Sequence, residues 1–107
     1  MNQRPSDVDY YGTKYWLNSE RQYHRDNDLP AVICSYCGWC EWYQNGKQHR
    51  DNNLPARICS DGDCEWWIDG KWIKREQCTP EEAKEYKKPY YQQKRFIKAS
   101  RFEKIIK

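Results

Sequence analysis

Two stretches of this chain repeat each other almost letter for letter: Gln-Tyr-His-Arg-Asp-Asn-Asp-Leu-Pro-Ala at residues 22–31 and Gln-His-Arg-Asp-Asn-Asn-Leu-Pro-Ala at residues 48–56. An internal repeat of this length is typical of stacked architectures, in which each unit leaves a face for its neighbour to cover. We therefore expect a short array of one supersecondary unit. Its function should come from a surface built of copies rather than from a single cleft.

A glycine followed four residues later by a tryptophan marks the start of each unit. The glycines are Gly12, Gly38 and Gly62, spaced by 26 and 24 residues, and the tryptophans are Trp16, Trp42 and Trp66. Alternation along residues 64–68 predicts a strand with Cys64 and Trp66 on one face. We interpret the three tryptophans as a core column rather than a ligand platform, because the chain has little else to bury.

Tight turns follow the second and third tryptophans. Asn45-Gly46 and Asp69-Gly70 lie between apolar runs, and such pairs are strong signals for type I′ hairpins because both turn residues need positive φ. The first copy has Ser19-Glu20 at this place, which predicts a looser turn. Each unit is thus predicted to be a strand, a turn, a second strand and a loop.

The composition points to one small domain with an aromatic core. The 107 residues include only 14 Leu, Ile, Val and Phe but 17 aromatic residues, and the net charge is +3. Three hairpins are about the minimum for a self-standing array and leave exposed strand edges. We expect a C-terminal helix to cap one end and a partner chain to cover the other.

The C-terminal segment changes from strand to helix signals. Thr79, Pro80 and Glu82 form a predicted capping box, so a helix should run from about residue 80 to 88, with a second helical stretch from Tyr90. We divide the chain into an arm (1–9), three hairpin units (10–78) and a basic helical tail (79–107). From Tyr86 to the last residue, the basic residues of the tail are Lys87, Lys88, Lys94, Arg95, Lys98, Arg101, Lys104 and Lys107.

The segment from Glu41 to His49 resembles the MORN-repeat family, whose units read as an aromatic residue, Asn-Gly-Lys and then a histidine. The resemblance covers about residues 10–75 and is weaker in the first and third copies. The family's usual Gly-x-Gly after the histidine is replaced here by Arg-Asp-Asn-x-Leu-Pro-Ala, a variant similar to repeats encoded by giant DNA viruses of amoebae. The resemblance implies a β-hairpin scaffold that dimerises or binds lipids, and a place in the cytoplasm, virion or virus factory.

The repeat loops contain His24, Arg25 and Asp26 in one copy and His49, Arg50 and Asp51 in the next. A catalytic group seldom needs to recur at equivalent places, and the chain has no glycine-rich phosphate loop or nucleophile motif. We interpret these loops as structural, with arginine and aspartate pairing or capping backbone groups, and we do not expect an enzyme. No apolar run is long enough to cross a bilayer and no signal peptide is visible.

Six cysteines leave three interpretations open. Cys34 with Cys40, and Cys59 with Cys64, bracket presumed turns and are candidate disulfide pairs if they lie opposite each other. Cys34, Cys37, Cys59 and Cys64 are candidate zinc ligands, although paired Cys-x-x-Cys knuckles are missing. Buried free thiols are the third interpretation and the one a reducing cytosol favours.

Two functions are compatible with these features. The first is a non-enzymatic scaffold, without a required cofactor, that forms a homodimer or binds another protein through an exposed strand edge. The alternative is binding of nucleic acid or an anionic membrane by the basic tail, with Tyr90 and Tyr91 available for stacking.

Overall fold

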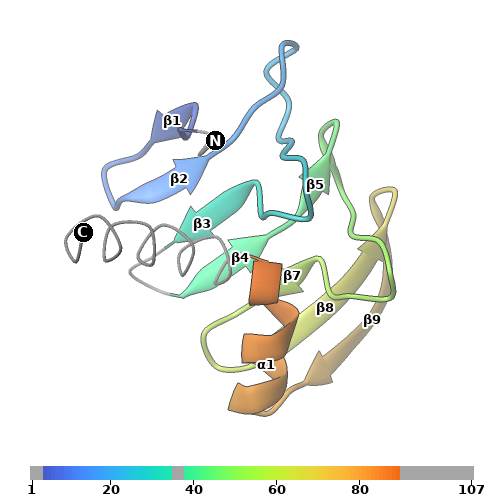
Figure 1. Ribbon diagram of the computed structural model, residues 1–107. Coiled ribbons are helices and arrows are strands. Elements are labelled where there is room, and N and C mark those ends of the chain that lie inside the picture. The colour runs from blue at the N-terminus through green and yellow to red at the C-terminus, as the bar shows by residue number, and fades with distance from the viewer. Residues whose placement is uncertain (1–3, 35–37, 90–107) are drawn as a thin grey trace, which may run out of the picture.

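The computed structural model describes residues 4–34 and 38–89. Its main feature is one antiparallel sheet of seven strands in the order β1-β2-β3-β4-β7-β8-β9, accompanied by a two-stranded sheet of β5 and β6 and one short helix (Figure 1). The strands are β1 (Asp7–Val8), β2 (Thr13–Tyr15), β3 (Val32–Cys34), β4 (Trp39–Glu41), β5 (Tyr43–Gln44), β6 (Lys47–Gln48), β7 (Arg57–Ile58), β8 (Asp63–Ile68) and β9 (Lys71–Gln77), and the helix is α1 (Pro80–Tyr86). The prediction of a mainly β fold is confirmed.

The chain forms three hairpins, and two of them have the predicted turns. The second hairpin pairs β5 with β6 around Asn45-Gly46, with φ of 50° and 83° at the two turn residues. The third pairs β8 with β9 around Asp69-Gly70, with φ of 49° and 79°. The first is closed by a bridge between Leu17 and Tyr23 and has a longer turn, as its sequence predicted.

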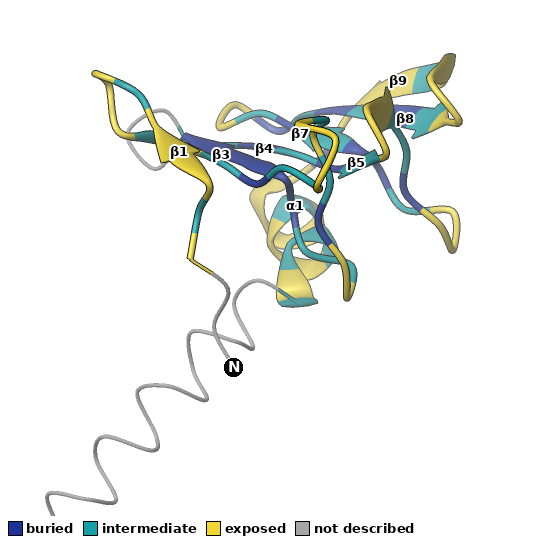
Figure 2. Ribbon diagram, turned by 90° about the horizontal axis from the view of Figure 1, so that it is seen from above, coloured by how far each residue is buried: buried dark blue, intermediate teal, exposed yellow. Residues whose placement is uncertain are grey.

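The tryptophan column is the core. Trp16, Trp42 and Trp66 are 4%, 3% and 5% exposed and belong to one buried cluster. The cluster also contains Ile33, Cys40, Ala56, Ile58, Cys64 and Cys78. Figure 2 shows the buried segments running through the sheet above α1. The indoles supply the apolar burial that the few aliphatic residues cannot provide.

Each repeat loop turns through two consecutive left-handed residues. These are Asn27-Asp28, with φ of 64° and 56°, and Asn52-Asn53, with φ of 63° and 55°. Asn and Asp tolerate this conformation better than other side chains with a Cβ atom. The following prolines, Pro30 and Pro55, are fully buried and return the chain to the sheet.

Helix α1 begins with the predicted capping box, in which Thr79 and Glu82 each accept a hydrogen bond from the other's backbone N–H. The ring of Tyr86 packs edge-on against Trp66 with centroids 5.9 Å apart. The helix therefore packs on the buried face of the sheet at Trp66, the last of the three core tryptophans. The helical stretch predicted from Tyr90 lies outside the described residues.

Candidate interaction surface

The loop histidines join neighbouring hairpins. The Nδ1 atom of His24 accepts a hydrogen bond from the backbone N–H of Asn45 at 3.1 Å, and Nδ1 of His49 accepts one from Asp69 at 3.0 Å. Because Nδ1 is an acceptor in both rings, the proton lies on Nε2, which donates to the aspartate two residues further along the chain. These contacts are His24 to Asp26 at 2.9 Å and His49 to Asp51 at 2.7 Å.

The loop arginines are buried against the tryptophans. Arg25 lies over the ring of Trp16 at 3.8 Å and Arg50 over Trp42 at 4.0 Å, with exposures of 4% and 2%. Their terminal nitrogens also donate to the carbonyls of the loop prolines: Arg25 to Pro30 at 3.2 Å and Arg50 to Pro55 at 3.1 Å. The arginines therefore cap backbone groups as predicted, and the loop aspartates bind the histidines.

A backbone ladder runs along the turns. The N–H of Gly46 donates to the carbonyl of Tyr23, and the N–H of Gly70 donates to the carbonyl of Gln48, both at 2.9 Å. Lys74 lies over Trp66 at 4.4 Å as Arg50 lies over Trp42, so Lys74 corresponds to Arg50. Trp72, two residues before Lys74, therefore corresponds to Gln48. Each hairpin thus donates a backbone hydrogen bond to the hairpin before it. In the third hairpin the equivalent acceptor is the backbone carbonyl of Trp72.

The third hairpin ends at an open strand edge. Among residues 4–34 and 38–89, β9 pairs with β8 and with no other strand. Its side chains are almost all exposed, including Trp72 at 55% and Ile73 at 53%. At the other edge of the sheet β1 is only two residues long, with Val8 at 50%. β9 is thus the longest strand and the more accessible of the two edges.

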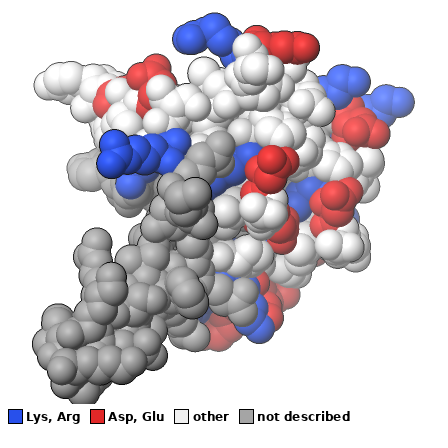
Figure 3. Space-filling model, turned by 45° about the horizontal axis from the view of Figure 1, so that its top comes forward, with Lys and Arg blue, Asp and Glu red and all other residues white. Residues whose placement is uncertain are grey.

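The face of the sheet opposite the core carries a charged cluster. Arg57 lies between Glu41 and Glu65, with N–O distances of 3.6 and 3.0 Å. Burial raises the pKa of Glu41, and the attraction of Arg57 only partly opposes this rise. On the surface seen in Figure 3, acidic and basic side chains of the described residues are interspersed.

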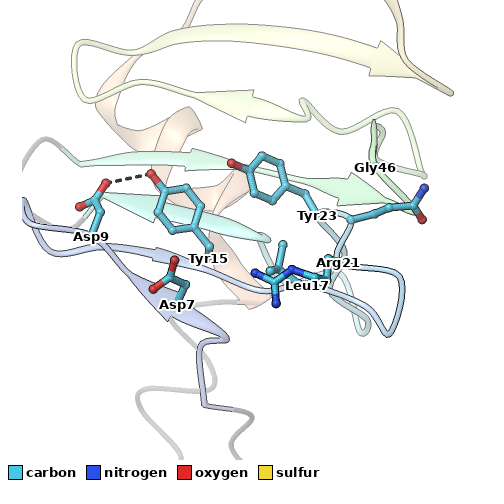
Figure 4. Close-up of a pocket in the computed structure, with 8 residues that line it drawn as sticks. Asp7, Asp9, Tyr15, Leu17, Arg21, Tyr23 and Gly46 are labelled. Atoms are coloured by element: carbon cyan, nitrogen blue, oxygen red, sulfur yellow. Dashed lines mark hydrogen bonds between the residues drawn. The ribbon is translucent and has the colours of Figure 1, made fainter.

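A groove beside β1 and the first hairpin adjoins this face (Figure 4). It has a volume of about 720 Å³ and is lined by Asp7, Asp9, Tyr15, Leu17, Arg21, Gln22, Tyr23 and Gly46. Tyr15 and Tyr23 are stacked, with ring centroids 5.6 Å apart and an interplanar angle of 16°. The residue pattern did not predict this groove, because β1 joins β2 only in the folded sheet.

The strand register corrects the predicted cysteine pairs. Cys34 lies opposite Trp39, and Cys64 lies opposite Ile58. Neither Cys34 and Cys40 nor Cys59 and Cys64 are therefore opposite each other, because the observed register differs from the expected one by one residue. Neighbouring residues of a strand point to opposite faces, so the two cysteines of each expected pair lie on different faces of the sheet. Cys40, Cys59, Cys64 and Cys78 are thiols, whereas Cys34 is half of a disulfide.

The proposed metal ligands are only partly described, because Cys37 lies outside the described residues. Within the described part of the chain no group of three or more His, Cys, Asp or Glu side chains has the arrangement of a metal site. Cys64 and Cys78 are buried in the core, and burial together with a hydrogen bond from the thiol of Cys64 to Cys78 raises the pKa of Cys64.

Two of the eight basic residues that follow Tyr86 are described. Lys87 donates to the carbonyl of Gly38 at 3.2 Å, and Lys88 pairs with Glu85 at 3.6 Å. The other six basic residues, Lys94 to Lys107, lie outside the described residues. No described helix is both long and apolar enough to span a membrane.

Comparisons with family models, curated proteins and solved structures found no match to this chain.

Proposed function

We propose that this chain is a non-enzymatic scaffold of MORN-like hairpin repeats that self-associates by pairing β9 with β9 of a second copy. The supporting observation is the long open edge of β9 with its exposed Trp72 and Ile73. Unpaired edge strands are ready templates for another chain, and large exposed apolar side chains mark contact surfaces.

The charges on β9 permit this contact. Lysine and arginine on an edge strand usually discourage pairing. Here Arg75 contacts Asp63 at 2.7 Å and Lys74 contacts Glu76 at 3.4 Å, so two of the three basic side chains are compensated within one chain. Two such edges can approach in antiparallel orientation with little repulsion.

A second copy is the partner that this edge fits best. An antiparallel pair related by a twofold axis uses the same strand from both chains, which is the usual form of a homodimer. The opposite edge is less suited, because β1 has two residues and provides few backbone hydrogen bonds. The contact therefore closes as a dimer and does not propagate into a filament.

The test is the mass of the full chain in solution by light scattering at micromolar concentration. The wild type is expected at twice the chain mass of 13.1 kDa. Ile73→Lys replaces an exposed apolar side chain of β9 with a charge and is expected to give a monomer. Val8→Lys is the matched control, since it adds the same charge to the other edge strand and should leave the dimer intact.

Two outcomes would contradict the proposal. The first is a wild type that stays monomeric over the micromolar range. The second is an equal effect of Ile73→Lys and Val8→Lys on the mass, which would place the contact elsewhere. Circular dichroism of each variant confirms that its sheet is retained.

A further inference from the structure

The tyrosine groove beside β1 has the composition of a ligand site distinct from β9. Its floor is formed by the stacked rings of Tyr15 and Tyr23, and Tyr43 meets the ring of Tyr23 edge-on at 5.2 Å. Tyr23 is 38% exposed, so part of an aromatic surface faces the groove. Ligand sites combine such surfaces with a few convergent polar groups.

Some of the polar groups here are fully engaged in holding the fold. One carboxylate oxygen of Asp9 accepts from the N–H groups of Tyr11 and Thr13, and the other accepts from the hydroxyl of Tyr15 at 2.9 Å. This network fixes the ring of Tyr15. The hydrogen bond to Asp9 accordingly raises the pKa of Tyr15 to about 12.

Other polar groups in the groove are available to a ligand. Within the described part of the chain, the guanidinium of Arg21 and the hydroxyl of Tyr23 make no hydrogen bond, and Asp7 uses one oxygen for the N–H of Val8. Figure 4 shows Asp7 and Arg21 on the same side of the two rings. The guanidinium donors of Arg21, the carboxylate of Asp7 and the hydroxyl of Tyr23 thus lie around the stacked tyrosine rings.

Arg21 occupies a strained position. Its φ is 62°, a left-handed conformation that the other two hairpins give to Asn-Gly or Asp-Gly. An arginine there costs conformational free energy that glycine would avoid. Strain of this kind concentrates at functional sites, where the side chain contributes something other than stability.

The charges of the groove select the class of ligand. Asp7 and Asp9 are negative and Arg21 is positive on this surface, and the oxygens of Asp9 are already used by hydrogen bonds within the fold. An anionic ligand would be repelled by Asp7, and a cationic ligand by Arg21. A neutral ligand with several hydroxyl groups can use both, because the carboxylate accepts and the guanidinium donates.

We propose that this groove binds an uncharged oligosaccharide, with a sugar ring stacked on Tyr23 and its hydroxyls bonded to Asp7 and Arg21. The apolar C–H face of a pyranose suits the exposed tyrosine ring, and the volume of about 720 Å³ accommodates a short oligomer. The site lies at the opposite edge of the sheet from β9, so it does not depend on self-association.

The test is a proton–nitrogen NMR titration of the full-length chain with three neutral trisaccharides: cellotriose, maltotriose and N,N′,N″-triacetylchitotriose. At least one is expected to shift the Nε–H signal of Arg21 and the amide of Gly46 saturably at concentrations up to about 20 mM, as weak sugar sites do. Silence of both signals with all three sugars overturns the proposal.

Arg21→Gly separates ligand binding from a structural role. Glycine relieves the strained turn, so the variant should melt at a higher temperature than the wild type while its affinity falls at least about tenfold, which corresponds to the loss of one charged hydrogen bond. An affinity unchanged in Arg21→Gly overturns the proposal. Glu20→Gln, in the same turn, is the matched control and should keep the wild-type affinity.

Tyr23→Ala tests the stacking surface and should reduce the affinity at least about tenfold, within the range found for aromatic stacking. A decaproline peptide is the competing ligand, since aromatic grooves also bind extended proline-rich segments. Shifts of Arg21 and Gly46 with decaproline and with none of the sugars would assign the groove to peptides and overturn the saccharide proposal.

Discussion

Arg50 holds Asp28 through two hydrogen bonds, from Nε at 2.8 Å and from a terminal nitrogen at 3.1 Å. The two residues lie 22 positions apart, in successive repeat loops. Arg50 also stacks on Trp42, whose Nε1 donates to the backbone carbonyl of Asp28 at 3.0 Å. One arginine thus ties the first loop to the core of the second hairpin.

Replacing this carboxylate should destabilise the array. We expect Asp28→Asn to lower the free energy of unfolding by about 2 kcal/mol, because the buried guanidinium loses its counter-charge while the partial exposure of Asp28 reduces the effect. Urea denaturation measures the change. Asp26→Asn is the control: this aspartate is 77% exposed and its loss should cost about 0.5 kcal/mol or less. Equal losses of unfolding free energy in the two variants would show that the contact of Asp28 with Arg50 contributes no more to stability than an exposed ion pair.

The third hairpin lacks an ion pair equivalent to Arg50–Asp28, and we expect that one can be introduced there. Asn53 corresponds to Asp28, since its carbonyl accepts from Nε1 of Trp66 at 3.0 Å, and Lys74 corresponds to Arg50. The double variant Asn53→Asp with Lys74→Arg should be more stable than the sum of its single variants by about 1 kcal/mol. A double-mutant cycle from urea denaturation measures this coupling. A coupling of zero would mean that the two loops are not geometrically equivalent.

Two glycines with similar backbone conformations should differ in their tolerance of alanine. Gly12 and Gly62 have φ of 80° and 89°, but a Cβ at residue 12 meets open space whereas one at residue 62 collides with the carbonyl of Cys78. Gly12→Ala should cost about 1 kcal/mol from the left-handed backbone alone. Gly62→Ala should cost about 1–3 kcal/mol more, because the backbone at Cys78, between β9 and α1, must shift. Thermal unfolding of the pair gives the difference, and equal melting temperatures would contradict the expected collision.

The local features of the fold could be predicted from the sequence, because each has a local physical cause. Asn45-Gly46 and Asp69-Gly70 form the hairpin turns, since both turn residues need positive φ. The tryptophans are buried because little else in the chain can form a core. The capping box of α1 depends on side chains only three residues apart.

Other features depend on register and on contacts between distant residues. The cysteine pairs were misplaced because a difference of one residue in the loop between two strands reverses the face, and Cys64 lies opposite Ile58. The Arg50–Asp28 contact joins two successive loops, so it can be identified only when the arrangement of the loops in space is known. The tyrosine groove likewise exists only once Asp9 and Tyr15 are joined by the pairing of β1 with β2.

Two tyrosines should make the fold sensitive to strong alkali. A hydrogen bond to Asp9 raises the pKa of Tyr15 from 10.0 to about 12, and burial beside Glu41 raises the pKa of Tyr43 from 10.0 to about 12. The fold therefore favours the neutral phenols. Their contribution to stability is fully present below pH 10 and should be lost as the pH rises from 10 to 12.

Urea denaturation at several pH values measures this loss. Tyr15→Phe and Tyr43→Phe should each flatten the dependence of the unfolding free energy on pH between 10 and 12, since each removes one group that titrates differently in the folded and unfolded states. Tyr10→Phe is the control, because that ring is 95% exposed. A wild-type stability that stays constant up to pH 12 would mean that neither hydroxyl is held in its neutral form by the fold.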